Sequence, residues 1–169
     1  MRKSYWLCVG VAMLAAGASS GETLYKIEPG PYEVRIIDEL TLNDAVQDRD
    51  ITLRLLYPNG AGPFPVVVYS TGYACWPQMY DRVTTHWVSH GYAVIAPNHL
   101  DSPNNAEPPR PDQFPYLLPS RMRDVSFVVD ELDEITRRAD IQGKIDDERI
   151  AIGGHSFGAV IAMIKTGLY

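Results

Sequence analysis

The sequence has no excess of basic residues, no low-complexity segment and no internal repeat. Its 15 Lys and Arg residues are outnumbered by 21 Asp and Glu residues, which gives a formal net charge of −6, and no basic stripe is present. We therefore expect no nucleic-acid partner. The hydrophobic fraction of 46% argues against a disordered chain and predicts one globular domain.

The sequence also lacks an apolar run long enough to cross a bilayer. Its first 18 residues are instead typical of a secretory signal peptide. Arg2 and Lys3 precede an apolar segment at 5–16 that is shorter than a transmembrane helix, and this segment leads into Ala-Gly-Ala, which fits a cleavage site. We predict cleavage after Ala18, a secreted or periplasmic protein without stable membrane insertion, and one domain at 19–169. An uncleaved N-terminal anchor is the alternative.

Cysteine is scarce, because Cys8 and Cys75 are the only two in the sequence. Cys8 lies in the apolar segment of the predicted signal peptide, so cleavage leaves Cys75 alone. An exported protein with one cysteine cannot form an internal disulfide. Cys75 is therefore interpreted as a buried thiol or as the partner of a cysteine outside the given sequence.

A sharp turn that carries a serine is predicted at residues 154–158, Gly-His-Ser-Phe-Gly. The turn follows a short apolar run at 149–153 and precedes a second one at 159–164. This order predicts a strand, a turn and a helix, with Ser156 at the turn. It is the setting that the G-x-S-x-G nucleophile elbow requires.

The two glycines of this motif have a steric role. The backbone of Ser156 is strained in so tight a turn, and Gly154 and Gly158 remove Cβ atoms that would otherwise clash there. The turn raises the serine hydroxyl above the sheet and aims the backbone N–H of Phe157 at a developing oxyanion. His155, inside the elbow, is expected to pack or form hydrogen bonds locally.

The order of apolar segments predicts an α/β fold. Strands are predicted at 32–42, 51–57, 65–70, 92–96 and 149–153. Helices are predicted at 79–90 and from Ser120 to about Arg138. The first two strands are joined by a polar, hairpin-like link at 43–50, and the later strands alternate with helices, which indicates βαβ units and a mostly parallel sheet.

A long loop with seven prolines is predicted at 97–119. It leaves the carboxyl end of a central strand, where open α/β sheets bind ligands. Its prolines, with Phe114 and Tyr116, predict an apolar and fairly rigid wall of a substrate pocket. In the helix that follows, the charged residues Arg121 and Asp124 are interpreted as members of surface pairs, as is Arg123.

Three motifs resemble the α/β-hydrolase superfamily, and they lie at residues 66–73, 88–99 and 147–158. Within it, the chain is most similar to the secreted esterase-like branch, which includes dienelactone-hydrolase-like proteins, platelet-activating-factor acetylhydrolases and polyester hydrolases. The resemblance covers residues 32–164. It implies the amino-terminal portion of an α/β-hydrolase domain, with antiparallel first strands and then parallel βαβ units up to the elbow and its helix.

The resemblance implies hydrolysis of a small-molecule carboxylic ester with no cofactor and no metal. Ser156 would be the nucleophile that forms an acyl-enzyme. Tyr73 matches the position whose backbone N–H supplies half of the oxyanion hole, and Phe157 N–H would supply the other half. The Tyr73 ring is expected to line the acyl pocket. His86 and His90 have a metal-ligand spacing but lack the Glu of the zincin motif, so no metal site is predicted.

The sequence lacks the acid and the histidine that should follow the nucleophile. None of the 13 residues after Ser156 is Asp, Glu or His, although the superfamily orders its triad as serine, acid, histidine. Three explanations stay open. The favoured one is a truncated piece of a longer esterase, because ending here leaves an apolar strand at a sheet edge. The others are an inactive hydrolase-like binding protein, and an atypical upstream base, for which His99 near Asp101 is the candidate.

Overall fold

The computed structural model describes residues 28–106 and 109–168. The predicted signal peptide, its cleavage site and Cys8 lie outside the described residues. Within this part of the chain, no helix is both long and apolar enough to cross a membrane.

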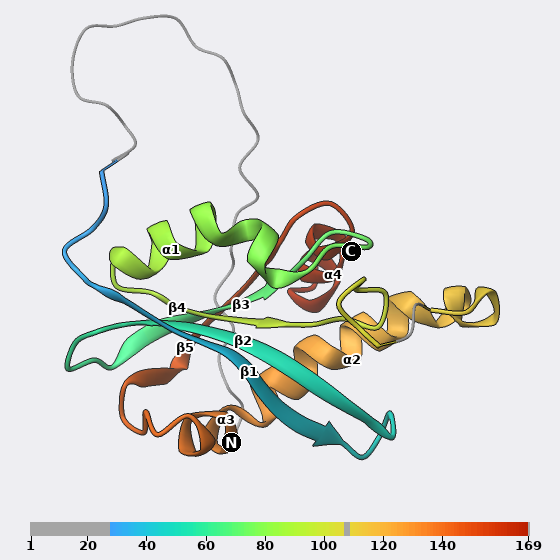
Figure 1. Cartoon of the computed structure of the whole chain (residues 1–169), viewed down its shortest axis with the longest axis horizontal. Helices are drawn as coiled ribbons and strands as arrows, with labels where there is room; N and C mark the ends of the chain where they lie inside the picture. Colours follow the sequence, from blue (N-terminus) through green and yellow to red (C-terminus); the bar gives the residue numbers. More distant parts are fainter. Residues whose placement is uncertain (1–27, 107–108, 169) are drawn as a thin grey trace, which may run out of the picture.

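Five strands form one mixed sheet in the order β1-β2-β4-β3-β5 (Figure 1). Their bounds are β1 Val34–Asp44, β2 Arg49–Pro58, β3 Phe64–Ser70, β4 Ala93–Pro97 and β5 Ile145–Gly154. β2 pairs antiparallel with β1 and with β4, whereas β3 pairs parallel with β4 and with β5. The predicted α/β class, with antiparallel first strands followed by parallel units, is therefore confirmed.

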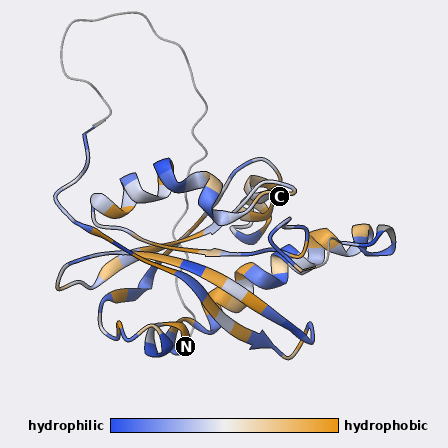
Figure 2. Ribbon diagram, viewed as in Figure 1, coloured by the Kyte–Doolittle hydropathy of each residue, from blue (hydrophilic) through white to orange (hydrophobic). Residues whose placement is uncertain are grey.

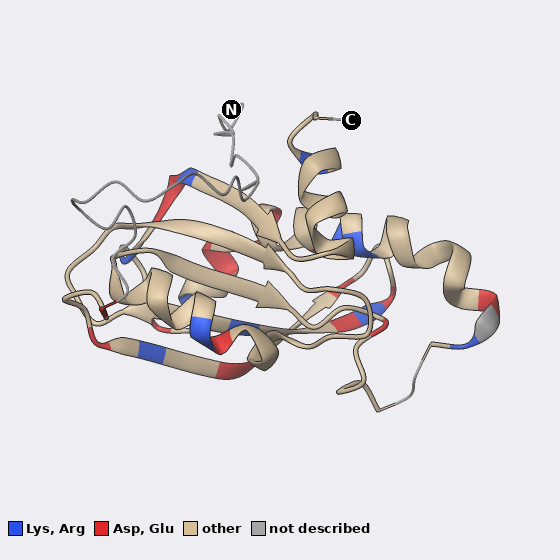
Figure 3. Cartoon of the chain, turned by 90° about the horizontal axis from the view of Figure 1, so that it is seen from above, with Lys and Arg blue, Asp and Glu red and all other residues tan. Residues whose placement is uncertain are grey.

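Helices cover both faces of this sheet. Figure 1 shows α1 on one side and α2 and α3 on the other. The α-helices are α1 Asp81–Ser89, α2 Leu117–Asp130, α3 Leu132–Arg138 and α4 Phe157–Lys165, and the 3-10 helices are η1 Pro77–Tyr80 and η2 Pro111–Tyr116. α4 carries one charged residue, Lys165, and is therefore almost entirely tan in Figure 3.

The alternation of side chains along β3 builds two hydrophobic cores. Val66 and Val68 pack in the larger core with residues of α2, α3 and α4, while Val67 and Tyr69 pack on the opposite face with Val88 of α1. Such alternation follows from the two-residue period of a strand, and a strand covered on both faces is apolar throughout. Much of the sheet is accordingly orange, the colour of hydrophobic residues, in Figure 2.

Two element boundaries differ from the sequence-based prediction. The hairpin link is shorter than 43–50, because β1 and β2 stay paired up to Asp44 and Arg49. The proline-rich loop is also shorter than expected, since it contains η2 and α2 already begins at Leu117. Pro111 and Pro119 are tolerated there because they lie in the first turns of η2 and α2, where N–H groups have no partner within the helix. The single helix predicted to Arg138 is interrupted at Glu131 and forms α2 and α3.

Candidate functional site

The parallel strands bring three loops to one edge of the sheet. β3, β4 and β5 run in the same direction, and Ser70 at the end of β3 lies beside Gly154 at the end of β5. The segments that follow these strands are 71–75, 98–102 and 155–157. These three segments therefore leave the sheet at the same edge, where open α/β sheets bind ligands. They are the predicted oxyanion loop at 71–75, the segment with His99 at 98–102, and the elbow residues 155–157.

The elbow has the strained geometry that its sequence predicts. Ser156 has φ 52° and ψ −118°, an uncommon conformation for a residue other than glycine, and it is exposed. A Cβ atom on Gly154 would lie 2.5 Å from the backbone of Gly158, and one on Gly158 would lie 2.0 Å from the carbonyl oxygen of Ser70. Both glycines are thus required by close backbone approach.

Two backbone N–H groups, one in the loop after β3 and one at the start of α4, have no hydrogen-bond acceptor in the described residues. Within the described residues, neither the N–H of Tyr73 nor that of Phe157 donates a hydrogen bond. Phe157 is the first residue of α4, where N–H groups point out of the helix end. Tyr73 lies in a tight turn in which the N–H of Cys75 donates to the carbonyl of Gly72 at 3.2 Å. These are the two donors predicted for an oxyanion.

Two exposed aromatic rings lie next to the oxyanion loop. Tyr73 is 49% exposed and Phe114 of η2 is 47% exposed, and their ring centroids are 6.5 Å apart. The proline-rich segment therefore folds back so that one of its aromatic residues contacts the loop after β3. Tyr116, the other aromatic residue predicted for the pocket wall, is exposed as well.

Arg121 and Asp124 of α2 are fully buried, so the interpretation of these residues as surface pairs is wrong. Arg121 donates to both carboxylate oxygens of Asp101, at 2.8 and 2.7 Å, and to the carbonyls of Thr71 and Gly72. Their spacing could have revealed this, because positions 121, 124 and 128 share one helix face and Val128 is a core residue. Arg123 is partly exposed and pairs with Asp44.

His99 is buried between two partners other than Ser156. Its Nε2 lies 2.9 Å from the Ser70 hydroxyl, and its Nδ1 lies 2.7 Å from Asp124. Burial lowers the pKa of His99 and outweighs the nearby Asp124 carboxylate, which raises it. Neutral His99 therefore donates from Nδ1 to Asp124 and accepts from Ser70 at Nε2. Both ring nitrogens are engaged, which speaks against His99 as the base for Ser156.

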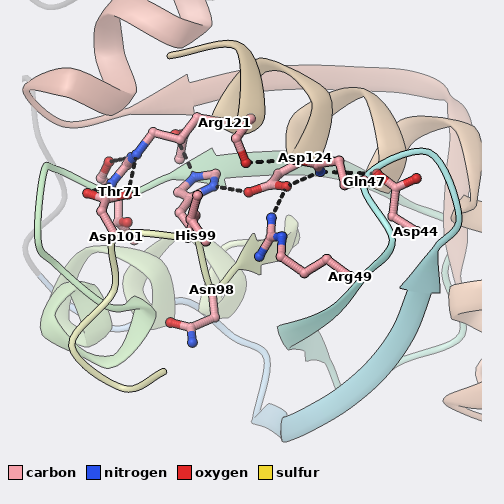
Figure 4. Close-up of polar contacts among 12 residues, drawn as sticks. Asp44, Gln47, Arg49, Thr71, Asn98, His99, Asp101, Arg121 and Asp124 are labelled. Atoms are coloured by element: carbon pink, nitrogen blue, oxygen red, sulfur yellow. Dashed lines mark hydrogen bonds and ion pairs between the residues drawn. The ribbon is translucent and has the colours of Figure 1, made fainter. Parts of the chain in front are cut away.

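The polar contacts of Asp124 continue toward the β1–β2 hairpin (Figure 4). Its carboxylate also accepts hydrogen bonds from Gln47, at 2.8 Å, and from Arg49. Gln47 in turn donates to Asp44. Burial raises the pKa of Asp124, but the hydrogen bond from His99 and the other neighbouring donors outweigh it, so the pKa lies below the ordinary value. Asp124 is thus a carboxylate that joins the hairpin to the sheet edge.

Tyr80 joins the elbow to the oxyanion loop. Its hydroxyl accepts a hydrogen bond from the Gly72 N–H at 3.0 Å and lies 3.0 Å from Nδ1 of His155. Burial raises the pKa of Tyr80, so the hydroxyl stays protonated and can donate to His155. His155 therefore forms a hydrogen bond with Tyr80, which lies 75 residues before it in the chain.

Other features lie apart from the elbow. A cavity of about 290 Å³ opens beside Asp38, Arg54 and Gln78, and its lining includes Asn98 of the loop after β4 but no residue of the segments 71–75 and 155–157. Cys75 is partly buried and has a free thiol. In the part of the chain that the structure describes, no cluster of three or more His, Cys, Asp or Glu side chains is arranged to hold a metal ion.

Comparison with known proteins identifies one family and a group of similar folds. The model of the family described as Chlorophyllase matches residues 23–165. No match to a curated protein was found. Among solved structures, the chain is similar to the esterase Est22, with a TM-score of 0.57 and 21% identity over 79% of this chain and 40% of that chain.

A second similar structure is brefeldin A esterase, a bacterial homologue of human hormone-sensitive lipase. Its TM-score is 0.55 at 19% identity, over 89% of this chain and 38% of that chain. At such identities the likeness is one of fold. The chain spans about 40% of the length of these two esterases.

Proposed function

Because the chain belongs to the chlorophyllase family and thereby to the α/β-hydrolase superfamily, we propose that it carries the nucleophile of a serine hydrolase. The predicted superfamily is confirmed by this match. The proposed reaction is hydrolysis of small-molecule carboxylic esters through an acyl-enzyme on Ser156. The esterase folds of Est22 and brefeldin A esterase support this reaction class.

The observation that carries the proposal is an exposed, strained serine flanked by two free N–H donors. Ser156 Oγ would attack the ester carbonyl carbon, and the carbonyl oxygen would become an oxyanion that accepts from Tyr73 N–H and Phe157 N–H. Expulsion of the alcohol leaves an acyl group on the serine, and water then releases the acid. Loss of one such donor typically costs about 100- to 1,000-fold in rate.

The base and the acid are proposed to come from sequence that follows residue 169. A serine hydroxyl needs an adjacent base to be an effective nucleophile, and no described side chain forms a hydrogen bond with that of Ser156, while His99 and His155 are engaged elsewhere. The chain spans about 40% of the similar esterases. In a full-length protein, a histidine near Ser156 and a carboxylate beside that histidine would complete the triad.

The rings of Tyr73 and Phe114 indicate the class of substrate. Two exposed aromatic side chains beside the oxyanion loop favour an ester with an apolar acyl or alcohol group. Chlorophyll, which the family name indicates, belongs in a test panel with aryl esters of short and long fatty acids.

The test uses the full-length protein with Ser156→Ala and, as a matched control, Ser126→Ala on α2. We expect kcat/KM of Ser156→Ala to fall by about 10⁴-fold or more, with the control unchanged. A serine-directed fluorophosphonate should label Ser156 in the native protein and nothing in Ser156→Ala. Native turnover in Ser156→Ala would overturn the proposal. A folded protein with neither turnover nor labelling would indicate a hydrolase-like binding protein.

Export is a separate proposal, supported by the sequence of the first 18 residues. N-terminal sequencing of the protein from its source should begin at Ser19. A mature protein that begins at Met1 would contradict cleavage.

A further inference from the structure

We propose that Arg121 is a positioning residue that fixes both halves of the oxyanion hole. This inference rests on the proposed function, because it names the residue that holds the two donors of that reaction in place. Arg121 touches neither the nucleophile nor the expected position of the substrate carbonyl. It would act through Tyr73 on one side and Phe157 on the other.

The first contact is with the peptide group that carries the Tyr73 N–H. Arg121 Nη2 donates to the carbonyl oxygen of Gly72 at 2.8 Å. The carbonyl of Gly72 and the N–H of Tyr73 belong to one peptide group, and in a planar trans peptide they point in opposite directions. Fixing the carbonyl toward Arg121 therefore fixes the N–H away from it. Hydrogen bonds in series also polarise one another, so this N–H becomes a stronger donor.

Further contacts hold the chain on both sides of Tyr73. Before it, Arg121 Nη1 donates to the carbonyl of Thr71 at 2.6 Å. After it, the N–H of Ala74 donates to Asp101 Oδ2 at 2.8 Å, and Asp101 is itself held by Arg121. Arg121 and Asp101 thus clamp the chain on both sides of Tyr73, and the Tyr73 N–H between these contacts is left as a free donor.

The second half of the oxyanion hole is reached through an aromatic ring. The Cζ atom of Arg121 lies 5.0 Å from the centroid of the Phe157 ring, within the range of a cation–π contact. Phe157 supplies the other proposed donor from its backbone. One buried guanidinium therefore contacts the peptide group that carries one of the proposed N–H donors and the side chain of the residue that carries the other.

Burial and charge make this clamp rigid under the conditions of the reaction. The side chains of Arg121 and Asp101 are both 0% exposed. Burial raises the pKa of Asp101, but hydrogen bonds from Arg121 and Ala74 outweigh it and keep the pKa below its ordinary value. The ion pair therefore persists at neutral pH. A planar guanidinium with five N–H donors can bind the carboxylate and two carbonyls at once, whereas a lysine ammonium cannot match this geometry.

The neighbouring Arg123 provides a matched control. It lies two residues away on α2, binds the carboxylate of Asp44 through two nitrogens at 3.0 Å, and contacts the ring of Phe127. Its partners lie on the hairpin and on α2 itself and include no oxyanion donor. Replacing Arg123 removes a comparable ion pair and aromatic contact.

The experiment compares Arg121→Met, Arg121→Lys and Arg123→Met in the full-length protein. Kinetics are measured on an aryl ester, and the affinity of a trifluoromethyl ketone, which forms a tetrahedral adduct with the serine, is measured for each. Urea unfolding gives the folded fraction used to correct each rate. We expect kcat of Arg121→Met to fall about 100-fold with KM within about threefold, as for a lost oxyanion donor.

The ketone should bind Arg121→Met more weakly by the same factor, because its adduct carries the oxyanion. Arg121→Lys, which keeps the charge and serves if the Met variant does not fold, should recover little of the loss. Arg123→Met should keep the native kcat and ketone affinity whatever its stability.

Three results would overturn the inference: a native kcat in the folded Arg121 variants, a loss confined to KM, or an equal loss in Arg123→Met. Ser156→Ala is measured in the same series. If native protein and Ser156→Ala hydrolyse the ester equally, the proposed function itself is wrong. If Ser156→Ala is inactive and Arg121→Met is not, only the positioning role is wrong.

Discussion

Replacing Gly158 with Ala tests whether the elbow depends on the close approach of α4 to the end of β3. A Cβ atom at position 158 would lie 2.0 Å from the carbonyl oxygen of Ser70 and 2.6 Å from that of Thr71. Real Cβ atoms essentially never come closer than 3.0 Å to such atoms. The first turn of α4 would therefore have to move by about 1 Å, because backbone atoms cannot rotate away as a side chain can.

This displacement acts on stability and on activity. Adding a methyl group to a well-packed site typically costs about 1–3 kcal/mol, so the free energy of unfolding should fall by that amount. The Phe157 N–H belongs to the displaced turn, and a 1 Å misplacement near a reacting group can cost about 100-fold in rate. We therefore expect kcat for ester hydrolysis to fall about 100-fold while the protein remains folded.

Gly153→Ala is the control for this prediction. A Cβ atom there would meet Val67 Cγ1 at 3.6 Å and Tyr69 Cδ2 at 3.8 Å, which are ordinary van der Waals contacts. Urea unfolding and initial rates of ester hydrolysis, both on the full-length protein, give the two quantities for each variant. A Gly158→Ala protein with native kcat would refute the reasoning, and so would equal losses in both variants.

Three further predictions concern the buried polar contacts. Burial lowers the pKa of His99 below 6.5, so the unfolded chain binds a proton at His99 more readily than the folded protein does. The free energy of unfolding should therefore decline as the pH falls below about 6.5. His99→Gln should flatten this slope in urea unfolding between pH 7 and 5, and an unchanged slope would contradict the prediction. Asp124→Ala leaves Arg49 without its carboxylate and should cost about 3–5 kcal/mol by the same assay, whereas a loss under 1 kcal/mol would show the pair to be dispensable. Tyr80→Phe leaves the Gly72 N–H without an acceptor and should cost about 1–3 kcal/mol; equal stability of the two proteins would exclude that role.

The strands and the elbow were predictable because their signals are local. The apolar residues of β3 by themselves predict a buried parallel strand. The elbow is predicted by five adjacent residues with apolar runs on both sides. Gly154 and Gly158 lie two residues before and after Ser156, and the structure shows that neither position has room for a Cβ atom. Each of these features depends on neighbours in sequence, so no tertiary contact was needed to find them.

The polar cluster behind the oxyanion loop was not predictable in the same way. His99 finds its partners 29 residues before it, at Ser70, and 25 residues after it, at Asp124. Arg121 reaches Thr71 across 50 residues of chain. A charged residue near a helix start looks the same in sequence whether it faces solvent or a distant loop. Only the packing of α2 across the ends of β3 and β4 distinguishes the two.

The register of β3 with β5 bears on how the protein folds. Phe64 pairs with Ile145 and Ser70 with Gly154, contacts that close loops of about 80 residues, whereas Thr41 pairs with Thr52 across a short turn. Long loops lose more chain entropy on closure and their contacts form later. We expect pulsed hydrogen exchange to protect the β1–β2 amides before those of β5, so the serine would acquire its strained conformation only after the β1–β2 hairpin has formed. The nucleophile would then stay unformed until β5 has paired with β3 across the intervening chain.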